Sequence, residues 1–232
     1  MVGIARKLFP IAFVLLFASS SFAQTGAGDF TKQFLDDEHH LWTSPLRART
    51  SDLKWLLPLS AGTAFLFHND TAMSREAEEA DFQHPSHIVS SAGSIYTFAA
   101  PIAVMAIGRL SGNAKASHAG GVALEAALHS TLIVQTLKVA TNRQRPDIGK
   151  GQGDFWDGGR SFPSGHSMSA WAVASALADQ YSGKKWVAIS GYSAAAAVSL
   201  SRISGGNHFP SDVLVGSSLG WLVGHYISHR HK

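Results

Sequence analysis

Residues 163–178 read PSGHSMSAWAVASALA, a short turn-forming motif that leads directly into a segment of small apolar residues. The segment is rich in Ala and Ser and lacks the strict alternation of a half-buried strand, so it predicts a helix. Pro163-Ser164-Gly165-His166 then lies at the N-terminus of that helix. Unpaired backbone N–H groups at such a place favour an anion, and Gly165 lets the backbone approach it closely.

Five further apolar segments of the same kind occur along the chain. They cover residues 55–67, 88–108, 118–137, 186–201 and 213–228. All are rich in Ala, Gly and Ser, which favours helices that approach one another closely. With 232 residues, the chain suits one domain with a substantial core. The sequence therefore predicts an all-α fold, a single helical-bundle domain of about six core helices over residues 55–232.

The N-terminal residues predict export from the cytoplasm. Arg6 and Lys7 precede an apolar run over residues 8–17, and small residues follow as far as Ala23. This is the pattern of an export signal over residues 1–23, which is either cleaved or kept as a signal anchor. Residues 24–54 are polar and mixed, and we interpret them as an N-terminal arm.

Composition excludes several classes of function. Charged residues make up 15% of the chain, and the net charge of +3 is spread out rather than clustered. A nucleic-acid-binding role is therefore not expected, because it would need a clustered basic stripe. The chain has no cysteine, so disulfides, thiolate metal sites and cysteine nucleophiles are excluded.

Three motifs in the second half of the chain carry candidate chemistry. In chain order they are Lys138-x6-Arg145-Pro146, Pro163-Ser164-Gly165-His166 and Ser201-Arg202-x5-His208-x3-Asp212. A phosphate monoester is dianionic near neutral pH, so a site for it needs several cations and directed donors. Lys138 supplies a compact charge, and Arg145 and Arg202 supply planar forks that can each hold two oxygens.

The third motif also pairs an imidazole with a carboxylate. His208 and Asp212 are four residues apart, and Pro210 between them predicts the start of a helix. A hydrogen bond from the imidazole to Asp212 would fix the tautomer of the ring and stabilise positive charge on it. Any one of these residues also has an ordinary structural explanation, as Ser164 has in capping a helix. The ordered set of all three motifs favours function.

In order and spacing, the three motifs resemble the signature of the type 2 phosphatidic acid phosphatases. That superfamily also contains bacterial class A acid phosphatases and vanadium haloperoxidases. The resemblance extends over about residues 131–226, and every signature position is filled. It implies an active site at one end of the bundle. There His208 attacks phosphorus to form a phosphohistidine, Asp212 orients His208, and His166 acts as general acid and then as general base.

The same resemblance implies how the phosphoryl group is held. Its oxygens would contact Lys138, Arg145, Ser164, Gly165 and Arg202, which stabilise the charge of the transition state. No metal and no cofactor are implied, because these cations neutralise the charge. The implied substrates are phosphomonoesters or diphosphates, above all lipid phosphates such as phosphatidate, phosphatidylglycerol phosphate, undecaprenyl diphosphate or the phosphates of lipid A. Two alternatives are a vanadate-dependent haloperoxidase and a non-catalytic envelope protein of the same fold.

The sequence leaves two locations in the cell envelope open. Residues 88–108 carry no charge and have about the length of a bilayer span, which needs roughly 20 apolar residues. If the signal stays as a span and residues 55–67 do not cross, the three motifs face the periplasm. Basic residues such as Lys184 and Lys185 then stay inside. The shorter later segments and Glu125 favour a soluble periplasmic enzyme instead. The oligomeric state is not predicted.

Overall fold

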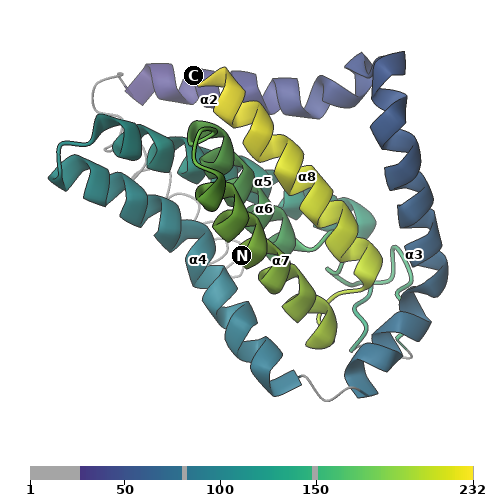
Figure 1. Cartoon of the computed structure of the whole chain (residues 1–232). Helices are drawn as coiled ribbons and strands as arrows, with labels where there is room; N and C mark the ends of the chain where they lie inside the picture. Colours follow the sequence, from purple (N-terminus) through teal and green to yellow (C-terminus); the bar gives the residue numbers. More distant parts are fainter. Residues whose placement is uncertain (1–26, 80–82, 148–150, 232) are drawn as a thin grey trace, which may run out of the picture. The chain divides into compact units, whose positions relative to one another are not determined.

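A computed structural model describes residues 27–79, 83–147 and 151–231, and every regular element in these ranges is helical (Figure 1). The predicted all-α fold is confirmed. The chain divides into two compact units, residues 1–50 and 51–232, and each is described by itself. The predicted export signal lies outside the described residues.

The first unit contains part of the predicted polar arm. Its helix α2, Ala27–Thr43, is followed by a 3-10 turn over Ser44–Arg47. Within the unit, Trp42 Nε1 donates a hydrogen bond to Glu38 Oε2 at 2.9 Å, and Arg47 Nη2 donates one to the carbonyl oxygen of His40 at 2.8 Å. The polar arm is therefore helical over much of its length.

In its described residues, the second unit contains six α-helices that form a bundle. They follow a 3-10 turn at Thr50–Asp52, which begins one residue before the unit. The helices are α3 Leu53–Glu79, α4 Gln83–Leu110, α5 Ala114–Thr141, α6 Gly165–Gln180, α7 Lys185–Ser204 and α8 Pro210–Arg230. Each of the six apolar segments seen in the sequence lies inside one of these helices. Within the described residues, no helix has both the length and the apolar character needed to cross a membrane.

Local sequence explains where α5 begins and ends. The side chain of Asn113 caps its N-terminus by accepting a hydrogen bond from the backbone N–H of Ala116 at 3.1 Å. At the other end Asn142 has a left-handed backbone with φ of 41°, and its N–H donates to the carbonyl of Lys138 at 3.1 Å. Lys138 thus lies in the last turn of α5, as the sequence predicts.

Helix α6 is the centre of the bundle and packs against α5, α7 and α8. Its approach to α8 depends on three glycines of α8 spaced four residues apart, Gly216, Gly220 and Gly224. A Cβ on Gly220 would lie 2.0 Å from the carbonyl oxygen of Met168, and one on Gly224 would lie 2.1 Å from that of Ala172. A larger residue would therefore force the two backbones apart.

This close packing brings two of the sequence motifs together. Helices α6 and α8 run in the same direction, because Ser164 N donates to the carbonyl of Asp212 at 2.9 Å and Gln180 Nε2 donates to that of Ser228 at 3.2 Å. The N-termini of both helices, and hence the second and third motifs, lie at the same end of the bundle.

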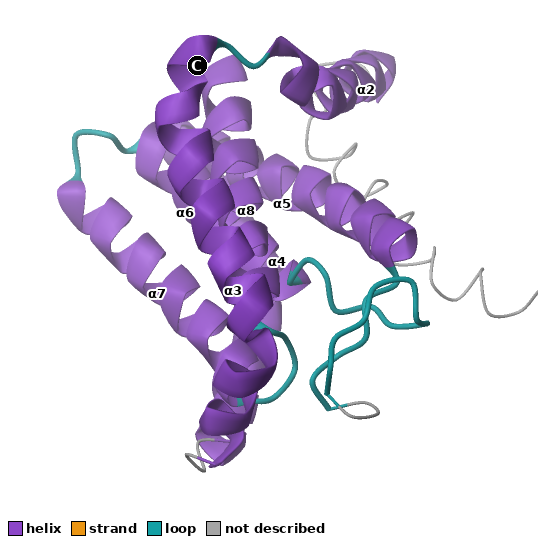
Figure 2. Cartoon of the chain, turned by 90° about the vertical axis from the view of Figure 1, so that its right-hand side faces the viewer, coloured by secondary structure: helices purple, strands orange, loops and turns teal. Residues whose placement is uncertain are grey.

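The long connection from α5 to α6, which carries Arg145 of the first motif, lies at the same end of the bundle. It is held to the end of α5 by backbone hydrogen bonds, from Trp156 N to Thr141 O at 2.8 Å and from Gly159 N to Asn142 O at 2.9 Å. Figure 2 shows this connection as loop beside the end of α5. All three motifs therefore meet at one end of the second unit.

Candidate active site

A cavity of about 330 Å³ lies where the three motifs meet. Five of the residues predicted from the sequence line it, namely Lys138, Arg145, Gly165, His166 and His208. The other three, Ser164, Arg202 and Asp212, are buried beside those five. The lining contains no carboxylate among the described residues, and it includes a third cation, Arg160. Such a donor set suits an anion and is unsuited to a metal cation.

The cations around the cavity are held together despite their mutual repulsion. Burial and the charge of Arg145 lower the pKa of Lys138 to about 8. Burial and Arg145 likewise lower the pKa of Arg202 to about 10. A bound anion would relieve this repulsion, so the arrangement is electrostatically prepared for one.

Each of two cations keeps a donor available for a ligand. Lys138 Nζ donates to the carbonyl oxygens of Arg160, at 2.5 Å, and Ser161, at 3.4 Å, which leaves one of its three N–H groups. Arg202 Nη2 donates to Asn207 Oδ1 at 2.7 Å, while its buried Nε has no hydrogen-bond partner in the described part of the chain. An unpaired buried guanidinium nitrogen is costly, so a ligand that accepts from it would be favoured.

The second motif lies at the start of α6, as the sequence predicts. Ser164 is the N-cap residue and Gly165 the first helical residue. The Ser164 hydroxyl accepts a hydrogen bond from Ser167 Oγ at 3.0 Å and makes no bond to the helix backbone. His166 follows in the first turn, where burial and the charges of Arg202, Lys138 and Arg145 lower its pKa to about 4. Its imidazole is thus neutral at pH 7 when no anion is bound.

His208 and Asp212 form the predicted imidazole–carboxylate pair, with His208 Nδ1 3.6 Å from Asp212 Oδ2. Both side chains are buried. Burial lowers the pKa of His208 to about 4, although Asp212 acts to raise it. Burial alone would raise the pKa of Asp212, but the neighbouring imidazole of His208 and the charge of Arg143 hold it below its ordinary value. At neutral pH the pair is a neutral imidazole beside a carboxylate, with Nε2 of the ring on the side away from Asp212.

Three residues that the sequence did not single out complete this pair. Ser161 Oγ donates to Asp212 Oδ2 at 2.5 Å and lies 3.4 Å from His208 Nδ1. Arg143 Nη1 donates to Asp212 Oδ1 at 2.6 Å, and Arg143 Nη2 donates to Asp70 Oδ2 at 2.7 Å. A buried chain of alternating charges thus runs from Asp70 on α3 to the imidazole of His208.

Comparison with protein families matches residues 119–232 to the model of the PAP2 superfamily. This part of the chain belongs to the PAP2 superfamily. Among curated proteins, the lipid A 1-phosphatase of Porphyromonas gingivalis is 34% identical over 93 residues, or 40% of this chain. The aligned region spans 19% of the length of that relative.

Two solved structures share the PAP2 fold with this chain. One is a transmembrane PAP2-type phosphatidylglycerolphosphate phosphatase from Bacillus subtilis, with a TM-score of 0.55 and 24% identity, covering 75% of this chain and 94% of its own. The other is LpxE from Aquifex aeolicus, with a TM-score of 0.53 and 22% identity, covering 69% and 94%. At this identity the likeness is one of fold.

Three residues of the site were not predicted from the sequence, and the reason differs from one to the next. Arg143 lies two positions before Arg145, inside the first motif of the PAP2 region, but a charged loop residue beside another gives no distinct signal. Ser161 lies just before the second motif. Asp70 lies 73 residues before Arg143, outside the residues matched to the PAP2 model, and no spacing connects the two.

Proposed function

We propose that this chain is a phosphatase that hydrolyses lipid phosphates through a phosphohistidine at His208, without a metal ion. The supporting observation is the cavity in which His166 and His208 meet Lys138 and Arg145, with the carboxylate of Asp212 behind His208. A nucleophile, an acid–base group and an anion-binding cluster are the three parts that phosphoryl transfer requires.

In the first step, the phosphoryl oxygens bind to Lys138, Arg145 and Arg202, to the hydroxyl of Ser164 and to the backbone N–H of Gly165. The lone pair on His208 Nε2 attacks phosphorus, and the P–O bond to the leaving group breaks. Asp212 stabilises the positive charge that develops on the ring. His166, whose pKa rises beside the bound dianion, gives its proton to the leaving oxygen.

In the second step, water hydrolyses the phosphohistidine. His166 is now neutral and takes a proton from water, whose oxygen attacks phosphorus. The P–N bond breaks, its electron pair returns to His208 Nε2, and phosphate leaves. The cations that hold the three equatorial oxygens act in both steps.

The substrate class is proposed from the relatives. The curated relative is named for the 1-phosphate of lipid A, and one structural relative for phosphatidylglycerolphosphate. Both names describe a phosphate carried on a lipid. We place the enzyme in the cell envelope, with residues 1–23 as export signal or anchor, 24–54 as polar arm and 55–232 as the phosphatase domain. The active site then faces the periplasm in both locations, embedded in the inner membrane or soluble.

The test measures phosphate release by detergent-purified protein in EDTA, from p-nitrophenyl phosphate and from lipid phosphates presented in micelles. His208→Ala is expected to lower kcat by about 10⁴-fold or more, as loss of a nucleophile does elsewhere. The matched control is His118→Ala, which removes an exposed histidine of α5 and should leave kcat unchanged. Phosphate trapped from labelled substrate should be labile in acid, stable in alkali and absent from His208→Ala.

Three results would each contradict a part of the proposal. Full turnover by His208→Ala would rule out His208 as the nucleophile, and loss of wild-type activity in EDTA would rule out metal independence. Turnover of soluble phosphates together with no turnover of any lipid phosphate would rule out the proposed substrate class.

A further inference from the structure

Asp70 and Arg143 form a closed ionic cluster directly behind Asp212. All three residues are at most 2% exposed. The guanidinium of Arg143 uses Nη2 for Asp70, Nη1 for both Asp212 and Ser211, and Nε for the carbonyl of Gly153 at 3.0 Å. Four groups thus accept hydrogen bonds from Arg143, so the plane of its guanidinium can rotate little.

Aromatic rings surround the same guanidinium. Its carbon lies 4.4 Å from the ring centre of Phe209, 4.9 Å from that of Phe155 and 5.0 Å from that of Phe67. Such contacts are favourable for a desolvated cation, and they exclude water from the ion pairs. Without water, the interactions between Arg143 and the two carboxylates are strong and directional.

Asp70 also anchors the start of α8. Its Oδ1 accepts the backbone N–H of Ser211 at 3.0 Å, and its Oδ2 accepts the Ser211 hydroxyl at 2.5 Å. The N-cap residue of α8 is Phe209, whose side chain offers no acceptor, so Asp70 supplies the missing cap from α3. The first turn of α8 contains Asp212. By fixing this turn, Asp70 restricts the position of the Asp212 carboxylate in addition to Arg143.

We infer that Asp70 and Arg143 are positioning residues for the phosphoryl-transfer reaction. Arg143 holds Oδ1 of Asp212, which leaves Oδ2 to face His208 Nδ1 and Ser161 and so fixes the tautomer that presents Nε2 to the substrate. Asp70 fixes Arg143 and the helix start together. Helix α3, which precedes the residues matched to the PAP2 model, thus completes the catalytic centre.

This inference rests on the proposed function, and its test is Asp70→Asn, which keeps the size of the side chain and removes its charge. We expect kcat to fall by about 10- to 100-fold, the range seen when a residue that orients a metal ligand is lost. The competitive inhibition constant of inorganic phosphate should stay unchanged, because the cations that bind phosphate do not contact Asp70. The matched control is Glu76→Gln, which removes an exposed carboxylate of the same helix.

A spectroscopic measurement separates positioning from general destabilisation. In ¹⁵N NMR of labelled histidines, wild-type His208 should carry its proton on Nδ1, and Asp70→Asn should show a mixture of tautomers at the same temperature. Arg143→Lys keeps the charge but loses the planar fork, and it should give the same kinetic pattern. It replaces Asp70→Asn in the test if that variant does not fold.

The outcomes distinguish this inference from the proposed function. If His208→Ala is inactive while folded Asp70→Asn keeps its kcat and its tautomer, the positioning role is wrong and the phosphatase stands. If His208→Ala is active, the proposed function fails first. A parallel loss of kcat and phosphate affinity in Asp70→Asn would show a merely structural role and would also overturn the inference.

A second, independent cluster lies at the opposite end of α6 and α8. Asp179 of α6 has its Oδ2 2.7 Å from Nδ1 of His225 and 3.6 Å from Nδ1 of His229, both on α8. The two imidazole centres are 4.1 Å apart. His225 is 13 residues beyond Asp212 on the same helix, which places the cluster roughly 20 Å from the phosphate cavity.

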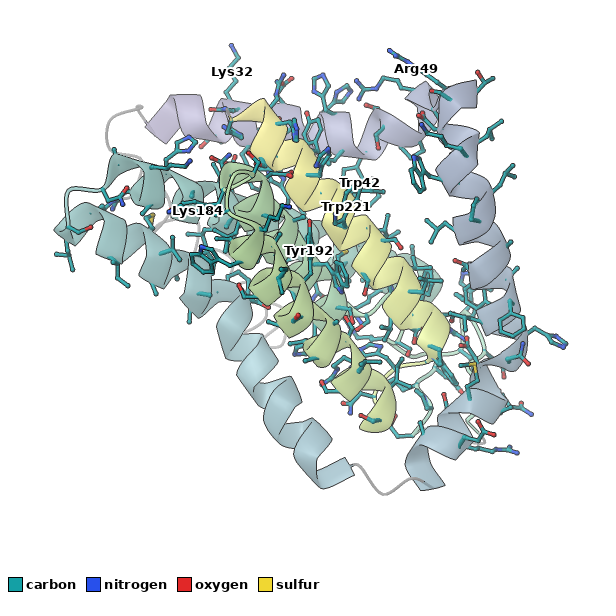
Figure 3. The ribbon with its side chains drawn as sticks, viewed as in Figure 1. Lys32, Trp42, Arg49, Lys184, Tyr192 and Trp221 are labelled. Atoms are coloured by element: carbon teal, nitrogen blue, oxygen red, sulfur yellow. The ribbon has the colours of Figure 1, made fainter. Side chains whose placement is uncertain are left out.

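The separations in this cluster suit a tetrahedral metal ion. Ligands at 2.0 to 2.1 Å from Zn²⁺ lie roughly 3.3 Å from one another in a tetrahedron, which is between the two Asp179–histidine distances of 2.7 and 3.6 Å. The ring of His225 is stacked on Trp221, with an interplanar angle of 8°, and Trp221 Nε1 donates to the hydroxyl of Tyr192 (Figure 3). This stacking fixes the plane of one ligand in advance.

We propose that Asp179, His225 and His229 bind a divalent transition-metal ion of the Zn²⁺ class, with water as the fourth ligand. His229 Nδ1 lies 2.9 Å from the carbonyl oxygen of His225, so the metal would replace that hydrogen bond. The bound ion would tie the end of α6 to the end of α8. It takes no part in phosphoryl transfer.

The test is the thermal unfolding of the tag-free chain with ZnCl₂ or MgCl₂. At a Zn²⁺ concentration about a hundred times its Kd, the unfolding midpoint should rise by about 5 to 10 °C, and Mg²⁺ should have no such effect. Calorimetry should give one Zn²⁺ per chain. The rise should persist in His118→Ala and vanish in the double variant His225→Ala/His229→Ala. Absence of a rise in the wild type, or its survival in the double variant, would overturn this site.

Discussion

Two groups of charged residues adjoin His208, and they differ in how their charges are compensated. On the cavity side, Lys138, Arg145 and Arg202 are like charges held together without a facing carboxylate in the lining. On the inner side, Arg143 is paired with both Asp70 and Asp212 and surrounded by aromatic rings. The first group is incomplete without an anion, and the second is complete as it stands.

The difference shows how one small region can both bind an anion and orient the imidazole of His208. Repulsion among the cavity cations costs stability, and that cost is recovered when a phosphoryl group arrives. Hydrogen bonds within the inner cluster use four of the five N–H donors of Arg143, and Arg143 does not line the cavity, so its effect on the reaction passes through Asp212. Lys138 and Arg202 are buried like the inner cluster and Arg145 is half-buried, so it is mainly the presence or absence of a paired carboxylate that distinguishes the two groups.

The largest expected effect comes from removing one arginine from each group. Arg143→Ala should lower the free energy of unfolding by about 3 to 5 kcal/mol, because it leaves two buried carboxylates without their cation. Arg202→Ala should instead lower kcat/KM by about 10² to 10³-fold, as loss of one transition-state donor does elsewhere. Its free energy of unfolding should stay within about 1 kcal/mol of the wild type, because the remaining cations repel less.

Urea unfolding and phosphatase kinetics on both variants check this contrast. Lys185→Gln, an exposed cation at the start of α7, serves as the control and should change neither quantity. If both arginine variants lost the same free energy of unfolding, the distinction between a paired and an unpaired group of charges would be wrong.

The inner cluster also marks the boundary of what the sequence could predict. Spacing within a motif predicts contacts between neighbours in the chain, so Lys138 at the end of α5, Ser164 at a helix cap and the His208–Asp212 pair were all located. The six helices follow from composition, because runs of Ala, Gly and Ser have few other stable forms. Their bounds extend well beyond the apolar segments in α3, where Leu53–Glu79 includes a polar half that carries Asp70.

Contacts between segments far apart in the sequence leave no pattern of spacing or composition from which they could be predicted. Asp70 meets Ser211, 141 residues away, because α3 packs against α8. An isolated Asp near the polar end of an amphipathic segment is indistinguishable in sequence from a solvated one. Arg143 was hidden for another reason, since its neighbour Arg145 already explained a basic loop. Burial, which depends on the whole fold, separates the paired arginine from the one that faces the cavity.

A smaller effect should follow from supplying the missing anion. Inorganic phosphate or vanadate at about a hundred times its Kd should stabilise the wild type by about 2.7 kcal/mol, because it binds the folded state alone. The stabilisation should be nearly absent in Arg202→Ala and preserved in Lys185→Gln. Differential scanning calorimetry at constant ionic strength measures it. An equal stabilisation of all three proteins would mean that the anion acts outside the cavity.

The smallest effect concerns one proton on Lys138. Its pKa is lowered to about 8 by burial and by Arg145, so its charge is present below pH 8 and is lost as the pH rises through that value. In the free enzyme kcat/KM should therefore decline above about pH 8, by about tenfold for each further pH unit. Lys138→Arg keeps a cation at every accessible pH and should remove this decline, even if its activity at pH 7 is lower. A pH profile of kcat/KM from 6 to 10 makes the comparison.

If the alkaline limb is unchanged in Lys138→Arg, the proton belongs to another group. Lys138 would then not be one of the cations on which binding in the cavity depends. A limb that disappears would show that burial of Lys138, together with repulsion from the other cavity cations, sets the upper limit of the pH profile.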